Sequence, residues 1–354
     1  MTRLLLVTND YPPKAGGIQQ YLGNLVRHID AEVMVLAPHD ADATDDPMVV
    51  RSDKTYMLPT SDIAAWATDH AMAFDPDYIL FGAPHPLPHL IRRLRTALDV
   101  PIGILCHGAE VTLPAAVPGV RRLLAGSLRA ADARFAVSEY TARRVERLTG
   151  EEVVFVGAGV DIDAFRPPRE AVDNRPPIVG CVSRFVPRKG QHRLIEAASQ
   201  LGREVELLFV GTGRTEVKLR TMAVDRAVRT RFEIGVAWER LPELYAEMDV
   251  FCMPSTSRWG GLEIEGLGLV YLEAEACGVP VLAGDSGGAP ETVIPGVTGF
   301  VVHDVADIVE GLRILLSDPD RARRMGAAAR RVVEERWTWP QVTDRFLAGF
   351  EDVR

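Results

Sequence analysis

The sequence has few cysteines, and none of them is placed for a disulfide or a metal clip. Only four occur in 354 residues, each in an apolar stretch and far from the others: Cys106, Cys181, Cys252 and Cys277. Secreted scaffolds that depend on disulfides are cysteine-dense, whereas isolated apolar cysteines are typical of reduced core residues. We therefore expect a cytoplasmic protein.

Long apolar runs and an excess of positive charge are also missing. No run approaches the roughly 18 apolar residues that a membrane-spanning helix needs, and Met1–Val7 is too short for a signal peptide. Any membrane contact is therefore expected to be peripheral, on the inner face of the cell membrane. The formal net charge of −9 argues against nucleic acid as a partner.

A dinucleotide-binding fingerprint is absent, although the chain alternates between strand and helix patterns. No GxGxxG motif follows the first apolar run, Leu4–Val7, which disfavours a nicotinamide oxidoreductase. Short apolar runs bounded by turn residues indicate buried parallel strands. In the first half these are Leu4–Val7, Glu32–Ala37, Tyr78–Gly82, Pro101–Cys106, Ala133–Val137 and Val153–Val156.

The same alternation restarts after a proline-rich segment. Residues 163–177 hold four prolines and mixed charge, and we interpret them as a linker. The strands expected beyond it are Ile178–Val182, Glu206–Val210, Phe232–Val236, Val250–Met253 and Val279–Ala283. The chain is long enough for two domains, so we predict an α/β protein of two similar halves facing across a cleft.

The most informative stretch is residues 257–291, which holds two carboxylates eight positions apart. Glu265 precedes a helix expected over 268–277, and Glu273 lies within it. Glycines surround the helix start, and bare N–H groups at a helix N-terminus attract anions such as phosphate. Carboxylates beside such a site suit hydroxyl groups of a sugar or ribose. Both could instead be solvated charges on a helix face.

A second loop carries cations at a similar place in the alternation. Arg184 and Lys189 flank the turn between the strand Ile178–Val182 and a helix expected from Gln191. An arginine fork and a lysine point charge beside a helix start can hold a diphosphate. The alternative is a solvated basic loop.

In the first half, two positions stand where open α/β sheets bind ligands. Gly16 and Gly17 precede a helix and permit close backbone approach, and His107 follows the strand Pro101–Cys106. The glycines could also form a tight turn, and His107 could be structural.

Two helices expected in the first half combine leucines with arginines. One carries Arg92, Arg93 and Arg95, and the other carries Arg121, Arg122 and Arg129. Basic amphipathic helices can lie on anionic lipid, but the same pattern fits helices that pack on their own sheet and expose a charged face.

Taken together, these motifs resemble those of retaining GT-B glycosyltransferases of the family-4 type. The resemblance covers nearly the whole chain, and its runs are LVTNDYPPKAGGIQQYL, SRFVPRKGQ and EGLGLVYLEAEACGVPVLAGDSGGAPETV. Within that family the chain is most similar to actinobacterial phosphatidylinositol mannosyltransferases, especially those that add an α-1,6-mannose to the monomannoside. The resemblance implies two Rossmann-like domains, over residues 1–165 and 166–340, with a final helix at 341–354 returning to the first.

The resemblance also implies residue roles. Arg184 and Lys189 would bind and stabilise the donor diphosphate, Glu273 the ribose, and Glu265 the transferred sugar. Further contacts are implied as well: His107 near the anomeric centre, Val236 and Ala237 at the base, Gly16 and Gly17 at the donor, and Asn9 and Asp10 at the acceptor.

The implied activity is transfer of mannose from GDP-mannose, with retention, to a phosphatidylinositol mannoside-type lipid, without a metal or other cofactor. The expected partners are thus a nucleotide-sugar donor, a lipid acceptor and an anionic membrane. Two alternatives stay open. One is a family-4 enzyme that uses a UDP- or ADP-sugar and another acceptor, and the other is a nucleotide-sugar epimerase.

Overall fold

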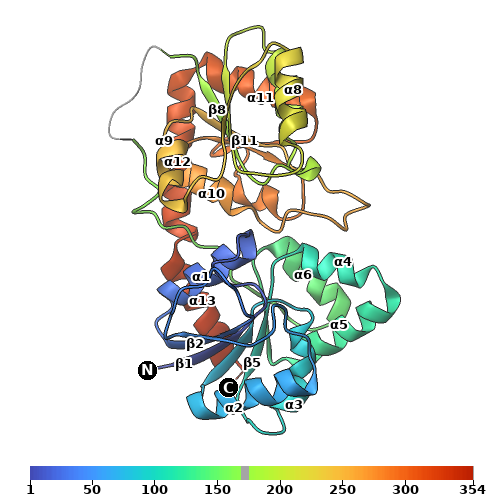
Figure 1. The fold of residues 1–354 in the computed structure, drawn as a ribbon. Helices are drawn as coiled ribbons and strands as arrows, with labels where there is room; N and C mark the ends of the chain where they lie inside the picture. The colour runs from blue at the N-terminus through green and yellow to red at the C-terminus, as the bar shows by residue number, and fades with distance from the viewer. Residues whose placement is uncertain (169–174, 354) are drawn as a thin grey trace. The chain divides into compact units, whose positions relative to one another are not determined.

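The computed structural model describes residues 1–168 and 175–353, which form two compact units (Figure 1). Unit 1 comprises Met1–Gly159 with Trp339–Arg354, and unit 2 comprises Val160–Thr338. Each unit has a parallel sheet with helices packed on it, as the alternation of strand and helix patterns predicts.

The sheet of unit 1 has seven parallel strands in the order β3-β2-β1-β4-β5-β6-β7. They are β1 (Arg3–Val7), β2 (Glu32–Ala37), β3 (Val49–Arg51), β4 (Tyr78–Phe81), β5 (Ile102–Cys106), β6 (Ala133–Ala136) and β7 (Val154–Phe155). The central strands β4 and β5 are buried along their whole length because helices cover both faces of the sheet. Chain order reverses between β1 and β4, which are neighbours in the sheet.

Seven α-helices belong to the described part of unit 1. They are α1 (Gly17–His28), α2 (Ser61–Phe74), α3 (Ile91–Leu94), α4 (Ala109–Ala115), α5 (Pro118–Ala130), α6 (Glu139–Thr149) and α13 (Trp339–Glu351), with a 3₁₀ turn, η1 (Leu87–Leu90). The basic helix predicted around Leu87–Leu98 is therefore only a 3₁₀ turn and one α-helical turn, whereas α5 is a full helix.

The last helix, α13, packs on unit 1 next to α1 (Figure 1). The rings of Phe346 and Phe350 pack at a tilt against the ring of Phe135 on β6, with centroid distances of 4.7 and 4.9 Å. Both side chains are almost fully buried, so a helix from the end of the chain completes the core formed by its beginning. The helix begins at Trp339 rather than at the predicted Gln341, because Pro340 fits the first turn of a helix.

Unit 2 has six parallel strands in the order β10-β9-β8-β11-β12-β13. They are β8 (Ile178–Val182), β9 (Glu206–Val210), β10 (Arg229–Glu233), β11 (Val250–Met253), β12 (Val281–Gly284) and β13 (Gly299–Val302). The order reverses between β8 and β11, as it does between β1 and β4 in unit 1.

The helices of unit 2 are α7 (Gln191–Ser199), α8 (Glu216–Asp225), α9 (Leu241–Ala246), α10 (Leu269–Ala276), α11 (Val305–Ser317) and α12 (Pro319–Arg336). Short 3₁₀ turns are η2 (Pro187–Lys189), η3 (Trp238–Arg240) and η4 (Ala289–Thr292). Within residues 1–168 and 175–353, every helix falls short, in length or apolar character, of what a membrane crossing requires.

One predicted strand was displaced. We expected Phe232–Val236, but β10 is Arg229–Glu233. The edge strand is charged: Arg229 and Arg231 both pair with Glu206 on β9, at 2.7 and 3.2 Å. Gly235 has φ +65°, which ends the extended run. Charge pairing along the edge therefore replaces the apolar pattern that usually marks a strand.

The segment that joins the two units begins inside unit 2. Phe165 is 1% exposed and packs edge-on against Tyr245, and the Arg330 guanidinium of α12 donates to the carbonyls of Ile162 and Phe165. The observed division after Gly159 therefore lies before the expected boundary at residue 165. Of the predicted linker, residues 169–174 lie outside the described residues.

Candidate functional site

In unit 2 the charged loops meet at the point where strand order reverses. Arg184 and Lys189 follow β8, and Glu265 follows β11, the neighbouring strand. Loops leaving the carboxyl ends of such a strand pair diverge to opposite faces of the sheet, and open α/β sheets bind ligands there. The fold therefore brings together residues that lie about 80 positions apart in the sequence.

A buried ion cluster occupies this point. One carboxylate oxygen of Glu265, Oε2, accepts hydrogen bonds from Lys189 Nζ and from Arg188 Nη1, each at 2.6 Å. Glu265 and Lys189 are 8% and 7% exposed. Arg188 also lies 3.6 Å from Glu263. Sequence reasoning singled out Lys189 and Glu265 but missed Arg188, whose signal was only its place beside Lys189.

The cluster fixes the charge of Glu265. Burial raises the pKa of this carboxyl, but the adjacent Lys189 ammonium and Arg188 guanidinium outweigh burial and hold the pKa at about 2. Burial lowers the pKa of Lys189, and the carboxylate opposes that shift. At neutral pH Lys189 and Arg188 therefore share the ionised carboxylate of Glu265, and Arg188 also contacts Glu263.

Glycines allow the two loops to approach this closely. Gly190 has φ +77°, and a Cβ there would lie 2.2 Å from the carbonyl oxygen of Pro254. Gly287 has φ +59°, and its Cβ would lie 1.9 Å from the carbonyl oxygen of Glu265. Neither position tolerates a side chain unless the backbone moves, so these glycines hold the loops after β8, β11 and β12 in register.

Arg184 differs from the cluster in being exposed. The neighbouring Phe185 is fully buried and anchors the loop. The backbone carbonyl of Arg184 accepts a hydrogen bond of 3.0 Å from Gln191 Nε2. Within residues 1–168 and 175–353, its guanidinium has no ion pair. This side chain is therefore a second, exposed source of positive charge on the same loop as Lys189.

Glu273 lies within α10 in a different environment. Its side chain is buried, and its Oε2 accepts a hydrogen bond of 2.7 Å from the hydroxyl of Tyr245, a partner that sequence reasoning missed. Burial raises the pKa of Glu273 to about 7, although the Tyr245 hydrogen bond favours the ionised form. The carboxyl is therefore poised to change its charge near neutral pH.

The residues expected at the base lie in the loop after β10. Ala237 is exposed and Val236 partly so, and Ala237 precedes the 3₁₀ turn η3. Because β10 ends at Glu233, both residues belong to a loop at the carboxyl edge of the unit 2 sheet rather than to a strand.

In unit 1, Asn9 and Asp10 follow β1 at the β1/β4 reversal. The Asn9 side chain is buried and bonds both backbone groups of Met57, at 2.9 and 2.8 Å, so its amide fixes the loop. Asp10 accepts from Gln19 Nε2 at 2.6 Å and lies 3.8 Å from Lys14. The acceptor roles of Asn9 and Asp10 stay predictions, and only Asp10 keeps a partly exposed side chain.

His107 lies buried after β5. Its Nε2 is 3.0 Å from the carbonyl oxygen of Gly82, which can only accept, so Nε2 carries a proton. Burial lowers the pKa of His107, against the favourable charge of Glu110. The ring is therefore neutral near pH 7, and Nδ1 can accept a hydrogen bond from a hydroxyl. Glu110 accepts from the backbone N–H groups of His107 and Gly108 and holds the turn.

The paired glycines open α1. Gly16 is the N-cap, without a capping side chain, and a Cβ there would meet the Gln19 side-chain oxygen at 2.1 Å. A Cβ on Gly17 would meet nothing within 4 Å. The first turn of α1 thus presents bare N–H groups and open space, as an anion site at a helix start requires.

These groups define what the site can do. Unit 2 presents two paired cations, an exposed arginine and a carboxyl whose pKa is about 7, which suit an anionic ligand with hydroxyl groups. In the described residues, no three or more His, Cys, Asp or Glu side chains are arranged to hold a metal ion.

The raised pKa of Glu273 makes stability depend on pH. Its folded pKa of about 7 exceeds the unfolded value of 4.5, so the folded chain binds the proton more tightly. Its contribution is therefore fully present below pH 4.5 and is lost as pH rises to about 7. In the parent chain, the free energy of unfolding should therefore decline by on the order of 3 kcal/mol across this pH range because of Glu273. We predict that the Glu273→Gln variant lacks this decline.

Urea denaturation across this pH window measures the effect, with the parent chain as reference. Buried Glu275 has a raised pKa of the same sign, so a residual slope is expected in the variant. Equal slopes in the parent and the variant would contradict the prediction.

Family models match both units. The model described as Glycosyltransferase Family 4 matches residues 15–164, and that described as Glycosyl transferases group 1 matches residues 163–332. The fold is shared with solved glycosyltransferase structures. A sucrose-phosphate synthase from Thermosynechococcus elongatus has a TM-score of 0.83 at 21% identity, over 99% of each chain. Anabaena HepE, in complex with UDP and glucose, has a TM-score of 0.79 at 19% identity, over 99% of this chain and 100% of the HepE chain.

Sequence relatives are nearer. The chain is 39% identical to the Corynebacterium glutamicum GDP-mannose-dependent monoacylated alpha-(1-6)-phosphatidylinositol monomannoside mannosyltransferase, covering 97% of this chain and 96% of the relative. It is 42% identical to the Mycolicibacterium smegmatis GDP-mannose-dependent alpha-(1-6)-phosphatidylinositol monomannoside mannosyltransferase, over 95% of each. The expected fold of two Rossmann-like domains is confirmed, and the chain belongs to the family-4, group 1 glycosyltransferases of GT-B fold.

Proposed function

We propose that this enzyme transfers mannose from GDP-mannose, with retention, to a phosphatidylinositol mannoside-type lipid at the inner face of the cell membrane. The similarity to enzymes of that name, at 39–42% identity over nearly full length, supports the donor and the acceptor class. The observation that carries the chemistry is the buried cluster of Glu265, Lys189 and Arg188 at the β8/β11 reversal.

The cluster suits a diphosphate that becomes a leaving group. Lys189 and Arg188 are already oriented by Glu265, so little reorganisation is needed when negative charge develops on the departing oxygen. Arg184 adds a flexible guanidinium that can close on the phosphates. We assign these three cations the role that a metal ion has in metal-dependent transferases, so the reaction should proceed without one.

The two glutamates keep one oxygen each for hydroxyl groups. Glu265 uses Oε2 for Lys189 and Arg188, and Glu273 uses Oε2 for Tyr245. Within the described residues, neither Oε1 atom is among the fully buried polar atoms that lack a hydrogen-bond partner. We assign Glu265 Oε1 to the transferred sugar and Glu273 Oε1 to the ribose. Backbone groups of Val236 and Ala237 would contact the base.

Retention follows from attack on the same face as the leaving group. The bond between the anomeric carbon and the diphosphate oxygen breaks, and the acceptor hydroxyl oxygen forms the new bond to that carbon. The acceptor proton passes to the departing diphosphate oxygen, whose charge the cations stabilise. Neutral His107 would accept a hydrogen bond from a sugar hydroxyl through Nδ1. Asp10, with the helix start at Gly16 and Gly17, would border the substrates.

Donor and acceptor are tested together by label transfer. Purified enzyme with EDTA should move radiolabelled mannose from GDP-mannose into organic-extractable lipid when phosphatidylinositol or its monomannoside is supplied. UDP-glucose and UDP-N-acetylglucosamine are the competing donors. Nucleotide release from a UDP-sugar, without labelled lipid from GDP-mannose, would favour the alternative family-4 activity and reject this proposal.

Arg184→Ala separates chemistry from stability. Because Arg184 is exposed, we expect its removal to change the free energy of unfolding by less than about 0.5 kcal/mol. Loss of one charge contact to the leaving group should lower kcat/KM roughly 100- to 1,000-fold. Arg226→Ala, at an exposed arginine after α8, is the matched control. Unchanged turnover in Arg184→Ala would exclude Arg184 from the mechanism.

Glu273 should make donor binding depend on pH. Ribose hydroxyls donate to a carboxylate, so bound donor favours the ionised form of a group whose pKa is about 7. Affinity should therefore weaken roughly tenfold for each pH unit below about 7, with proton release on binding. The phosphates of GDP-mannose are diesters and do not titrate there.

Calorimetric titration of GDP-mannose in buffers of different ionisation enthalpy measures both effects. Glu273→Gln should bind more weakly above pH 7, by about 1.5–3 kcal/mol, and without the pH dependence. A variant that binds like the parent at every pH would refute the ribose role.

A further inference from the structure

A pair of histidines in unit 1 has no part in the site described above. His85 and His89 lie on the segment that follows β4, and His89 belongs to the 3₁₀ turn η1. A spacing of four residues places two side chains on the same side of a helical turn. Nδ1 of His85 lies 3.3 Å from Nε2 of His89, and the two ring planes are 82° apart. Two ring nitrogens from separate residues therefore lie close together.

The distance between these nitrogens favours a shared metal ion over a hydrogen bond between the rings. Hydrogen bonds donated by N–H groups in proteins typically measure about 2.7–3.2 Å. Two nitrogens that each bind a tetrahedral zinc ion at about 2.0–2.1 Å lie about 3.3–3.4 Å apart. The observed 3.3 Å is thus long for a hydrogen bond and matches the separation of two zinc ligands.

The segment that carries the histidines is conformationally restricted. Pro84, Pro86 and Pro88 fix three φ angles within five residues. These prolines are buried, and so are Leu87 and Leu90, whereas both histidines are partly exposed. The two rings are therefore held in place from below and stay accessible to an ion and to water. Such a site needs little reorganisation when it binds its ligand.

Ser127 of α5 supports the pair. Its hydroxyl oxygen lies 2.6 Å from Nδ1 of His89, and the serine is 6% exposed. Metal-binding histidines almost always donate their other ring N–H to an oxygen, which fixes the tautomer. When Nδ1–H of His89 donates to Ser127, the lone pair is on Nε2, the nitrogen that faces His85. The buried hydroxyl therefore favours the tautomer that a metal ion requires.

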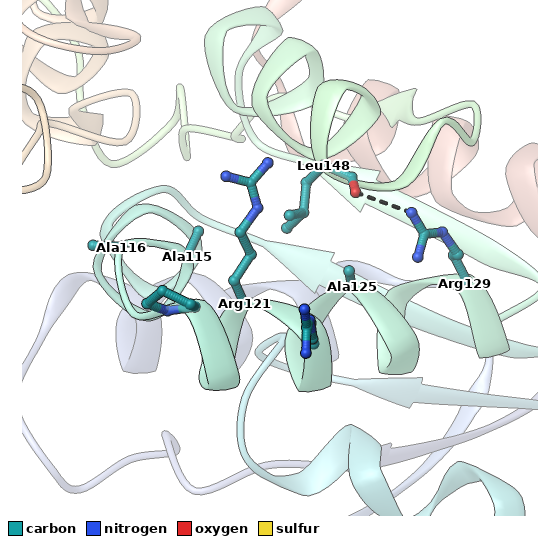
Figure 2. A pocket seen from close by; sticks show the side chains of 8 residues that line it. Ala115, Ala116, Arg121, Ala125, Arg129 and Leu148 are labelled. Atoms are coloured by element: carbon teal, nitrogen blue, oxygen red, sulfur yellow. Dashed lines mark hydrogen bonds between the residues drawn. The ribbon is translucent and has the colours of Figure 1, made fainter.

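The two faces of α5 differ in what they offer. Arg121 and Arg129 lie on the face that lines a pocket (Figure 2). Ser127 lies with Leu124 and Leu128 among the buried residues of the helix, which packs on η1. Helix α5 therefore brings a hydroxyl group rather than a guanidinium to the histidines, and a hydroxyl group is compatible with a bound cation.

We propose that His85 and His89 bind a zinc ion, with Ser127 as the outer hydrogen-bond partner of His89. Among the described residues no third histidine, cysteine or carboxylate joins the pair, so water would occupy the remaining positions around the ion. Structural zinc sites are closed by four protein ligands. A site with two protein ligands suits reversible binding instead.

The inference goes beyond the proposed function and does not depend on it. The proposed transfer of mannose needs no metal, so zinc at this pair is an accessory ion. The pair nevertheless lies close in sequence to the reaction site, because Gly82, three residues before His85, accepts the hydrogen bond from His107. Zinc binding is measured without donor or acceptor, so the two proposals fail separately.

Titration of the full-length, tag-free chain with zinc chloride tests the proposal. The protein is first freed of metal with EDTA and returned to metal-free buffer, and binding is followed by calorimetry. The parent should bind a zinc ion that the His85→Gln/His89→Gln variant does not bind. Ser127→Ala keeps both histidines and should weaken the affinity roughly 10- to 100-fold, as loss of an outer partner usually does.

The matched control is His39→Gln/His303→Gln, which removes two exposed imidazoles elsewhere in the chain and should bind zinc as the parent does. Cobalt chloride gives a second readout, because four-coordinate cobalt absorbs visible light far more strongly than six-coordinate cobalt. Strong absorption should appear with the parent and the control but not with His85→Gln/His89→Gln. Equal zinc binding by the parent and that variant, or equal losses in both double variants, would overturn the proposal.

Urea denaturation of the parent needs no variant. An ion that binds only the folded chain raises the free energy of unfolding as its concentration increases. Zinc should therefore shift the urea midpoint of the parent upward, and EDTA should reverse the shift. A midpoint that does not respond to zinc would show that the histidine pair holds no metal, and the proposal would be rejected.

Discussion

The buried contact of Glu265 with Lys189 and Arg188 sets the electrostatics of unit 2. A carboxylate removed from water is unfavourable unless it is paired, and removing one partner of a buried pair costs about 3–5 kcal/mol. Here one oxygen receives two cations at 2.6 Å, and the pKa of Glu265 stays at about 2. The loops after β8 and β11 are therefore tied together, and two cations are fixed in place where the sheet reverses its order.

Glu265 and Glu273 show how environment separates identical groups eight residues apart. Cations lower the pKa of the first, while a buried site with one phenol as partner raises that of the second. The difference arises from Lys189 and Arg188, which lie in another segment of the chain and lower the pKa of Glu265, whereas burial is the main influence on Glu273. A carboxylate of constant charge can orient cations at any physiological pH, whereas one with a pKa of about 7 responds to whatever donates hydrogen bonds to it.

The sequence predicted the buried strands, because their apolar pattern depends only on neighbouring residues. The apolar runs Ile178–Val182 and Glu206–Val210 are β8 and β9 to the residue, because buried parallel strands need such runs. Sequence reasoning misplaced β10, whose Arg229 and Arg231 pair with Glu206 on the neighbouring strand β9 and with Glu204 and Glu247 in other segments. Arg188 was missed for the same reason, since its partner lies 77 positions away. Long-range pairing of charges cannot be inferred from spacing along the chain.

The loop after β8 separates two kinds of cation. Lys189 and Arg188 are held by Glu265, so their positions owe little to any ligand, and replacing either leaves a buried carboxylate short of a partner. Arg184 is exposed. Preorganised charges stabilise a transition state without reorganisation at the moment of reaction, while an exposed guanidinium can adapt to the ligand. Substitutions in the cluster therefore change folding and binding together, and only Arg184 reports on charge alone.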